Sequence, residues 1–384
     1  MKNILFIHQS AELYGSDKTL LLLLKNLDKT LYHPVVVLPN NGPLIQELEK
    51  ENIKVVIAPV LKLYRKIFSP KNLFHFLLDI KKGISILDDL NKQYHFDLIY
   101  SNTLAVLLGM LFAKKRKIKH LWHVHEIIVH PKIIASTFPK LLNKYADLIV
   151  CNSLATKKNL VDRKKELANK TTVIYNGINE TISEMSLAKK EDFGFTNKDI
   201  IITLVGRISR LKGHKWLLTT LVKHFSSNTN IKVVFVGSPV PGQEFYASEI
   251  DQFITENQLQ ETVKILPFTK NLSQIWDITD IALMPSTEAE SFGLVAAEAM
   301  LAKKPVIASN HGGVTEIVVN NKTGFLVEPN NVEALSLALN NLIVNPEMRK
   351  EFGEKGYQRV IQEFSVEKYA KNFEAAFSKL IPQE

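Results

Sequence analysis

The feature that most constrains the fold is a regular alternation of short apolar runs with longer amphipathic segments. Seven apolar runs lie in the first half of the chain, at residues 4–8, 34–38, 55–58, 98–100, 121–124, 148–151 and 172–175. Six more follow, at residues 200–205, 233–236, 263–266, 281–284, 306–308 and 324–327. Short buried strands that alternate with helices form parallel sheets with helices on both faces. The sequence therefore predicts an α/β protein with two doubly wound, Rossmann-like domains.

The length of the chain supports this division. A chain of 384 residues is long for a single hydrophobic core. Residues 179–197 are polar and lack a strong apolar period, and we place the domain boundary after residue 187. Ligands of open α/β sheets bind beyond the carboxyl ends of the strands, so we expect a site in a cleft where the two domains face each other.

Composition and charge bear on location and partners. No apolar run approaches the ~20 residues that cross a bilayer, and the N-terminus lacks a signal-peptide pattern, so we expect a cytoplasmic protein. The only cysteine, Cys151, follows an apolar run and is expected to be an inert buried thiol.

Residues 1–190 carry a net charge of +13 and residues 191–384 carry −4. Unless the lysines only solvate the surface, the basic half favours a negatively charged partner, such as an anionic membrane surface. No nucleic-acid-binding motif is present.

Residues 285–300, with the sequence PSTEAESFGLVAAEAM, contain the most informative motif. Two carboxylates, Glu290 and Glu298, are separated by seven residues that include a loop-like Ser-Phe-Gly sequence and the start of an apolar helix. The first turn of a helix has unpaired N–H groups and the positive end of the helix dipole. Such a site can bind a polyhydroxyl ligand through the carboxylates and its phosphates through backbone amides.

This motif resembles the signature of the retaining glycosyltransferases of family 4, which have the GT-B fold. In that family a Glu, an aromatic-Gly pair and a second Glu are followed by Ala-Met, as here. The resemblance implies a nucleotide-sugar donor site in the second domain, residues 188–364. It implies an acceptor site in the first domain, residues 1–187, to which a C-terminal helix in residues 365–384 crosses back. Glu298 would bind the donor ribose and Glu290 would lie against the donor sugar, with further donor contacts from Phe292, Gly293 and Leu294.

A basic pair follows the first strand of the second domain. Gly206-Arg207 and Lys212-Gly213 place two cations at a strand end. Arginine can hold a diphosphate with its forked guanidinium, and lysine meets it as a point charge. The segment closely resembles the family's Gly-Arg and Lys-Gly pattern, whose basic pair holds the donor diphosphate. We therefore expect Gly206, Arg207 and Lys212 in the donor site.

Two positions of the first domain extend the predicted site. Gly15 lies in a turn before a leucine-rich helix, which is loosely similar to the family's Gly-Gly-Ala-Glu-Arg turn, although Asp17 stands where Glu is usual. His125 ends the fifth strand and matches a histidine that the family often has close to the transferred sugar and the acceptor. It could bond a sugar hydroxyl without acting as a strong base, whereas we expect His123 to be structural.

Three further segments resemble the family, one of them with a departure. Phe268 follows a strand near the position where family members hold the nucleotide base. Residues 311–316 resemble the Gly-Gly-x-x-Glu turn near the donor site. Lys303 and Lys304 stand where a small residue and glycine usually precede Pro-Val, which puts the conformation of that loop in doubt. No Asp-x-Asp motif is present, so we expect neither a metal nor another cofactor.

The resemblance implies that a sugar is transferred, with retention of configuration, from a UDP- or GDP-sugar to a saccharide or lipid-linked acceptor. This would serve surface polysaccharide or glycolipid biosynthesis, with catalytic residues Glu290, His125, Arg207 and Lys212. Residues 62–82 mix aromatic and leucine side chains with six cations. They fit either an interfacial helix on the inner face of the plasma membrane or an amphipathic helix packed on its own core. Three alternatives stay open: a GT-B nucleotide-sugar epimerase, a catalytically silent sugar-nucleotide binding module, and a nucleic-acid binder.

Overall fold

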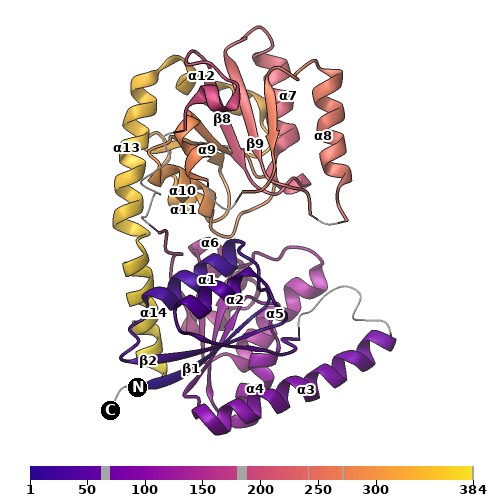
Figure 1. Ribbon diagram of the computed structural model, residues 1–384, viewed down its shortest axis with the longest axis vertical. Helices are drawn as coiled ribbons and strands as arrows, with labels where there is room; N and C mark the ends of the chain where they lie inside the picture. Colours follow the sequence, from indigo (N-terminus) through magenta and orange to yellow (C-terminus); the bar gives the residue numbers. More distant parts are fainter. Residues whose placement is uncertain (62–69, 180–187, 241, 270–271, 383–384) are drawn as a thin grey trace. The chain divides into compact units, whose positions relative to one another are not determined.

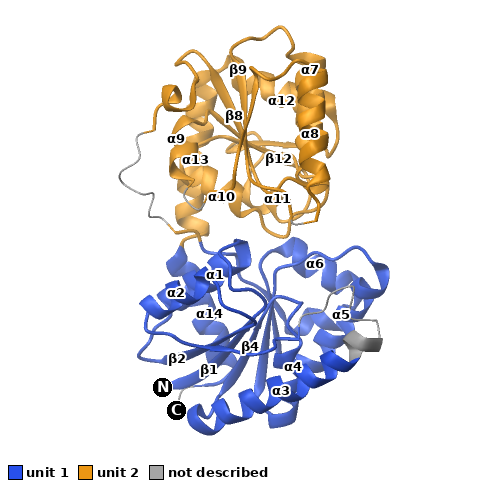
Figure 2. Ribbon diagram, turned by 45° about the vertical axis from the view of Figure 1, so that its right-hand side comes forward, with its two compact units in different colours: residues 1–177, 366–384 blue, residues 178–365 orange. Residues whose placement is uncertain are grey.

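The computed structural model describes residues 1–61, 70–179, 188–240, 242–269 and 272–382 (Figure 1). The chain divides into two compact units, which Figure 2 shows in different colours. Unit 1 comprises Met1–Gly177 and Val366–Glu384, and unit 2 comprises Ile178–Ser365. Every predicted apolar run forms a strand whose bounds lie close to the predicted ones.

Unit 1 is built on a parallel sheet of seven strands in its described residues, in the order β3-β2-β1-β4-β5-β6-β7. The strands are β1 (Lys2–His8), β2 (Tyr32–Leu38), β3 (Lys54–Ile57), β4 (Leu98–Asn102), β5 (Lys119–Val124), β6 (Leu148–Cys151) and β7 (Thr171–Val173). The α-helices are α1 (Gly15–Asn26), α2 (Pro43–Lys50), α3 (Pro70–Tyr94), α4 (Leu108–Arg116), α5 (Lys132–Tyr145), α6 (Leu154–Arg163) and α14 (Val366–Leu380). Leu5 and Ile7 belong to the apolar cluster of α3, α4 and α5, whereas Ile4 and Phe6 belong to that of α1, α2 and α14. Alternate residues of β1 thus face opposite helical layers, which is why the strand is continuously apolar.

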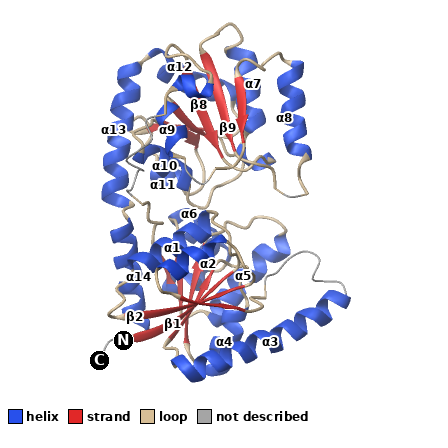
Figure 3. Cartoon of the chain, in the orientation of Figure 1, coloured by secondary structure: helices blue, strands red, loops and turns tan. Residues whose placement is uncertain are grey.

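Unit 2 has the same architecture, with six parallel strands in its described part, in the order β10-β9-β8-β11-β12-β13. The strands are β8 (Ile200–Val205), β9 (Ile231–Val236), β10 (Val263–Leu266), β11 (Ile281–Met284), β12 (Val306–Ser309) and β13 (Gly324–Val327). The α-helices are α7 (His214–His224), α8 (Phe245–Glu256), α9 (Ser273–Ile278), α10 (Leu294–Leu301), α11 (Val314–Ile317), α12 (Val332–Val344) and α13 (Pro346–Glu363). Figure 3 shows the strands of each unit as one layer between helices. The predicted doubly wound architecture is confirmed for both units.

Each sheet reverses its strand order at one point, and this point positions the candidate site. The reversal lies between β1 and β4 in unit 1 and between β8 and β11 in unit 2. In doubly wound sheets, ligands bind outside the carboxyl ends of the strands at such a switch point. The residues that follow these four strands are therefore the first place to look for a site.

The C-terminal helix packs on unit 1, as the family resemblance implied. Phe373 and Phe377 of α14 are fully buried in the cluster that contains Phe6 and Tyr100. The ring centroids of Phe6 and Phe377 lie 6.3 Å apart, and those of Tyr100 and Phe373 lie 5.8 Å apart. Residues more than 250 positions apart in the sequence thus share one apolar core.

The chain passes from unit 1 to unit 2 between Gly177 and Ile178, earlier than the boundary we placed after residue 187. A Cβ atom on Gly177 would lie 2.9 Å from Cβ of Tyr369, so this glycine fits closely against α14. The Ile178 N–H donates to the carbonyl of Phe364, 2.8 Å away, which ties the next residue to unit 2. Residues 180–187 lie outside the described residues.

Two expectations from composition can be compared with the structure. Cys151 is fully buried at the end of β6, and its burial raises the pKa of the thiol, as expected for an unreactive cysteine. Within the described ranges, no helix combines the length and the hydropathy that a membrane span requires.

Candidate functional site

Three strand ends of unit 1 bring polar side chains together at the switch point. His8 ends β1, Asn102 ends the adjacent β4, and His125 directly follows β5. Asp17 lies in the first turn of α1, the helix that follows β1. His8 Nε2 lies 2.5 Å from Asp17 Oδ1 and His8 Nδ1 lies 3.0 Å from Asn102 Nδ2. Asn102 Oδ1 lies 2.8 Å from His125 Nε2, so these four side chains, here called the strand-end cluster, form one hydrogen-bonded chain.

Burial determines the protonation of the histidines in and beside this cluster. Desolvation, together with nearby His8, lowers the pKa of His125 to about 3, although Asp17 opposes the shift. Desolvation also holds the pKa of His123 well below its usual value. The Tyr100 hydroxyl lies 2.6 Å from His123 Nδ1, and burial keeps the pKa of this phenol high, so the phenol keeps its proton and can donate it to the imidazole. Both histidines are therefore neutral at physiological pH, and His125 is a weak base.

The loop after β4 is held in a strained conformation beside this cluster. Thr103 has a φ of 81°, a left-handed conformation that is rare for a β-branched residue. Its N–H donates to the His123 carbonyl at 2.8 Å, and its own carbonyl accepts from Trp122 Nε1 at 2.8 Å. The Glu126 carboxyl accepts from the Leu104 N–H at 3.1 Å. These bonds hold the loop that follows Asn102 in place.

The predicted anion-binding turn at Gly15 has a feature that the sequence did not reveal. Gly15 is the first residue of α1, as expected. However, Asp17 Oδ2 accepts a hydrogen bond from the Tyr14 N–H at 2.8 Å, so a carboxylate already lies at this helix N-terminus. A contact between Gly15 and a donor phosphate stays a prediction.

In unit 2, Lys212 and Glu290 form the centre of the candidate site. Lys212 ends the short 3₁₀-helix η4 (Arg210–Lys212) after β8, and Glu290 follows β11. Lys212 Nζ lies 2.5 Å from Glu290 Oε1, which also accepts from Ser286 Oγ at 2.6 Å. Burial alone would raise the pKa of Glu290, but the positive charge of Lys212 and these hydrogen bonds lower it overall. Glu290 is therefore a stable carboxylate at the switch point of unit 2.

Glycines hold the backbone around Glu290. The Gly313 N–H donates to the Glu290 carbonyl at 2.7 Å. Gly312 has a φ of 71°, and a Cβ atom there would lie 2.4 Å from the Glu290 carbonyl oxygen. Gly293 has a φ of 111° and caps the start of α10. The Gly-Gly turn near the predicted donor site thus directly supports the loop that carries Glu290.

Two family models match the chain. Glycosyltransferase Family 4 matches residues 14–181, and Glycosyl transferases group 1 matches residues 185–359. The chain belongs to glycosyltransferase family 4. An uncharacterized glycosyltransferase of Methanocaldococcus jannaschii is 28% identical over 343 residues, which cover 87% of each chain. An alpha-1,3/1,6-mannosyltransferase of Dictyostelium discoideum is 25% identical over 335 residues, which cover 78% of this chain and 76% of that one.

A solved structure supports the fold of the whole chain. The crystal structure of HepE from Anabaena in complex with UDP is similar with a TM-score of 0.83 and 26% identity. The match covers 99% of this chain and 100% of that one. HepE has also been solved with UDP-glucose. The two doubly wound units of this glycosyltransferase are those of the GT-B fold.

The other predicted donor residues lie after strand ends of unit 2 or on α10. Gly206 and Arg207 follow β8 and Phe268 follows β10, with its side chain half exposed. Leu294 begins α10, and Glu298 lies on the same helix. The structure brings Lys212 into contact with Glu290. Gly206 lies close to the same lysine, since a Cβ atom added to this glycine would lie 3.3 Å from Lys212 Cδ. Arg207 and Phe268 follow β8 and β10, two strands of the same sheet.

Phe292 has a position that the motif alone could not reveal. Its side chain is only 2% exposed and packs edge-on against Phe364, with ring centroids 5.7 Å apart. The ring therefore packs inside unit 2, where it supports the turn and is closed to a donor in this structure. Lys303 lies in the loop before Pro305-Val306, which departs from the family pattern. It has a φ of 58°, a left-handed conformation that glycine adopts at no steric cost.

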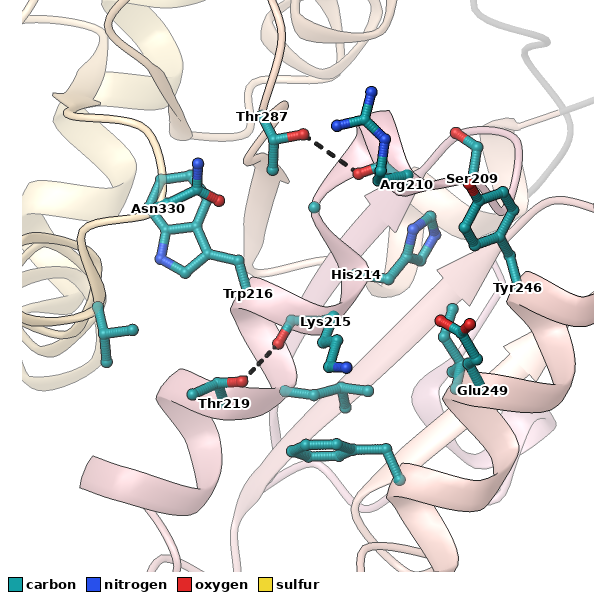
Figure 4. Close-up of a pocket in the computed structure, with 15 residues that line it drawn as sticks. Ser209, Arg210, His214, Lys215, Trp216, Thr219, Tyr246, Glu249, Thr287 and Asn330 are labelled. Carbon is teal, nitrogen blue, oxygen red and sulfur yellow. Dashed lines mark hydrogen bonds between the residues drawn. The ribbon is translucent and has the colours of Figure 1, made fainter.

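A separate pocket of about 490 Å³ lies over the start of α7 (Figure 4). Its lining includes Arg210, Trp216, Tyr246, Glu249 and Thr287, but no predicted site residue. His214 also lines this pocket, and both of its ring nitrogens are buried without a hydrogen-bond partner in the described part of the chain.

Four residues of the candidate site were not predicted from the sequence: His8, Asp17, Asn102 and Ser286. Asp17 was visible only as a departure from the family turn. His8 and Asn102 end adjacent strands, and that position could have identified them. Ser286 precedes Glu290 by four residues and was inside the motif, but its contact with the carboxylate depends on the shape of the turn.

Proposed function

We propose that this protein is a retaining glycosyltransferase that moves a sugar from a UDP- or GDP-sugar to a saccharide or lipid-linked acceptor. The observation that carries the proposal is the Lys212–Glu290 pair, held at the switch point of unit 2 by the Gly312–Gly313 turn. A cation and a carboxylate at this place suit a ligand that combines phosphates with sugar hydroxyls. Family membership and the UDP complexes of HepE support a nucleotide-sugar donor.

The donor site assigns a separate role to each charged residue. As the glycosidic bond breaks, negative charge develops on the diphosphate, and Arg207 and Lys212 would neutralise it without a metal. Glu298 would accept hydrogen bonds from the ribose hydroxyls, and Glu290 would lie against the donor sugar. Glu290 would then accept hydrogen bonds from sugar hydroxyls, because its lowered pKa keeps it ionised.

Retention is explained by attack on the same face of the sugar. The acceptor hydroxyl forms the new glycosidic bond while the bond to the diphosphate breaks, and the leaving phosphate takes the acceptor proton. A double displacement on a carboxylate nucleophile would give the same stereochemistry. We favour same-face attack because Glu290 already bonds Lys212 and Ser286 through one oxygen.

The acceptor would bind unit 1, which contains His125 and the basic half of the chain. Residues 62–69 of the proposed interfacial segment lie outside the described residues, but α3 begins directly after them. Phe74, Leu77 and Leu78 of α3 are 61%, 52% and 46% exposed, although large apolar side chains are usually buried. Lys81 and Lys82 are also exposed. Apolar side chains beside cations support binding to an anionic membrane, at its inner face, with a lipid-linked acceptor.

A thermal-shift experiment tests the donor site. UDP, GDP, ADP and CMP are added separately to the wild type and to Glu298→Ala. A ligand that binds only the folded state adds about 2.7 kcal/mol at one hundred times its dissociation constant. We expect a rise in Tm with one nucleoside diphosphate and its loss in the variant. No rise with any nucleotide would contradict the donor site and favour one of the alternative functions.

Product analysis then tests the reaction. With the nucleotide that gives the shift, a panel of its sugar conjugates is incubated with candidate acceptors, and the anomeric configuration of the product is read by NMR. An inverted product would reject retention, and an epimerised nucleotide sugar would identify an epimerase.

A further inference from the structure

The strand-end cluster defines which atom of His125 faces a substrate. Its members His8, Asp17 and Asn102 are each at most 1% exposed, so water does not compete for their hydrogen bonds. His125 itself is only partly buried. The question is where its single proton lies, because that determines whether the exposed nitrogen donates or accepts.

The chain of hydrogen bonds has one consistent direction. The carboxylate of Asp17 can only accept, so His8 Nε2 carries the proton that lies between them. His8 Nδ1 faces the amide nitrogen of Asn102, which can only donate, so Nδ1 is the acceptor of this hydrogen bond. The Asn102 carbonyl oxygen is left to accept from His125 Nε2.

The amide of Asn102 is prevented from turning over. Its Nδ2 also lies 3.3 Å from the carbonyl oxygen of Ser16, to which it donates its second proton. A flipped amide would place two oxygens at that contact. The second neighbour of His125 Nε2 is His123 Nδ1 at 3.1 Å, and this nitrogen can accept from Tyr100 and from His125 alike.

We propose that His8, Asp17 and Asn102 are positioning residues that keep the proton of His125 on Nε2 and make Nδ1 a hydrogen-bond acceptor for a substrate hydroxyl. In the described structure, Nδ1 of His125 has no bonding partner. The identity of the ligand as a sugar or its acceptor rests on the proposed function. The tautomer does not, because it follows from contacts within unit 1.

The tautomer predicts the chemical class that fits beside His125. An unprotonated imidazole nitrogen accepts a hydrogen bond from a hydroxyl group. It repels a carboxylate or phosphate oxygen, because that oxygen has no proton to donate. The group that meets His125 is therefore a neutral hydroxyl. A sugar with a carboxylate or a phosphate at this position would be a poor substrate.

The charged and titratable groups around His125 come from four elements. These are His8 of β1, Asp17 of α1, Tyr100 of β4 and His123 of β5, with Glu126 next to His125 in sequence. Burial raises the pKa of Glu126 to about 7, although the N–H groups of Leu104 and His125 oppose the shift. Glu126 can therefore titrate near neutral pH, so a pH profile alone would not identify His125.

The test reads the tautomer directly by long-range ¹H–¹⁵N NMR of histidine side chains, with His125 assigned by its loss in His125→Gln. In the wild type we expect a proton on Nε2 and no titration of His125 between pH 5.5 and 8. In Asn102→Ala the fixed acceptor is lost, so we expect a mixture of tautomers. In Asn102→Asp a carboxylate replaces the neutral amide, so His125 should titrate inside this pH range.

Ser101→Ala is a matched control. Ser101 is also fully buried and precedes Asn102, but its hydroxyl bonds His120 Nε2 at 2.9 Å. We expect this variant to leave the His125 tautomer unchanged. If Asn102→Ala and Asn102→Asp leave it unchanged as well, the proposal is wrong.

Kinetics connects the tautomer to turnover. For Asn102→Asp we expect kcat/KM to fall at least tenfold at pH 6 and to recover partly at pH 8, as protonated His125 loses its acceptor nitrogen. An altered tautomer with unchanged kinetics would reject the positioning role. An NMR result as expected, with no sugar transfer by the wild type, would reject the proposed function and retain the tautomer.

Discussion

At the scale of the residue, the Lys212–Glu290 ion pair is expected to contribute to stability as well as to the proposed donor site. The two side chains are 24% and 20% exposed, so this pair is partly buried, as is Lys190–Asp280, whose side chains are 18% and 23% exposed. Surface pairs contribute about 0–1 kcal/mol, whereas removing one partner of a buried pair leaves an uncompensated charge and costs more. Lys223 and Glu333 form a comparison pair that is 60% and 66% exposed.

Lys212→Met is therefore expected to lower the free energy of unfolding by about 1–3 kcal/mol at pH 7. The lowered pKa of Glu290 means that its contribution is present above the usual carboxyl pKa of 4.5 and is lost as pH falls through the folded-state value. The difference between variant and wild type should then shrink as the pH falls below 4.5. Urea denaturation of the variant and the wild type at pH 7 and at a pH below 4.5 measures this difference in the free energy of unfolding. Lys223→Met is the control and should lower the free energy of unfolding by less than about 1 kcal/mol. Equal losses for Lys212→Met and Lys223→Met would contradict the stabilising role of the Lys212–Glu290 pair.

At the scale of the element, a glycine turn supports the loop that carries Glu290 in unit 2. Gly312 and Gly194 both have positive φ angles, of 71° and 78°. A Cβ atom on Gly312 would collide with the backbone of Glu290, whereas one on Gly194 would have nothing within 4 Å. Alanine variants at these two glycines therefore separate the free-energy cost of the left-handed conformation from the cost of displacing the loop that carries Glu290.

Both Gly194→Ala and Gly312→Ala should lower the free energy of unfolding by about 1–2 kcal/mol, because alanine is strained in the left-handed conformation. Gly312→Ala should lower it further and should also weaken nucleotide binding, because the turn at Glu290 must shift. Thermal shift with the bound nucleotide measures both effects. Unchanged nucleotide binding by Gly312→Ala would show that this turn does not shape the donor site.

The exposed apolar face of α3 gives a second prediction for an element. Replacing Phe74, Leu77 and Leu78 by Ser removes apolar area that is already in water, so folding should be little affected. Sedimentation with anionic phosphatidylglycerol vesicles at low salt should show binding by the wild type and at least tenfold weaker binding by the triple variant. Leu337→Ser, at a 63% exposed position of α12, is the control. Wild-type protein that stays in solution would reject the membrane proposal.

At the scale of the whole molecule, unit 1 combines two segments that are far apart in the sequence, Met1–Gly177 and Val366–Glu384. The α14 helix of the second segment inserts Phe373 and Phe377 into the core formed with the first. Phe377→Ala should lower the stability of unit 1 by about 3–5 kcal/mol, as for other large buried side chains. Lys379→Ala, which also alters α14, should cost under about 0.5 kcal/mol.

The tryptophans allow this prediction to be measured in one unit. Trp122 lies in unit 1, whereas Trp216 and Trp276 lie in unit 2. In a background with Trp216→Phe and Trp276→Phe, the fluorescence of Trp122 reports the unfolding of unit 1. An unchanged transition in Phe377→Ala would contradict the packing of α14 on this unit.

The sequence by itself determined the strands, the two doubly wound units, the family and the candidate residues of the donor site. It could do so because apolar period, glycine turns and the Glu290–Glu298 spacing are local properties of a few consecutive residues. The tertiary structure decided which way Phe292 points, where the chain passes between the units, and the existence of the strand-end cluster. His8 and Asn102 are 94 positions apart and meet only because β1 and β4 pair in the sheet. That pairing depends on the packing of both helical layers, which no local pattern encodes.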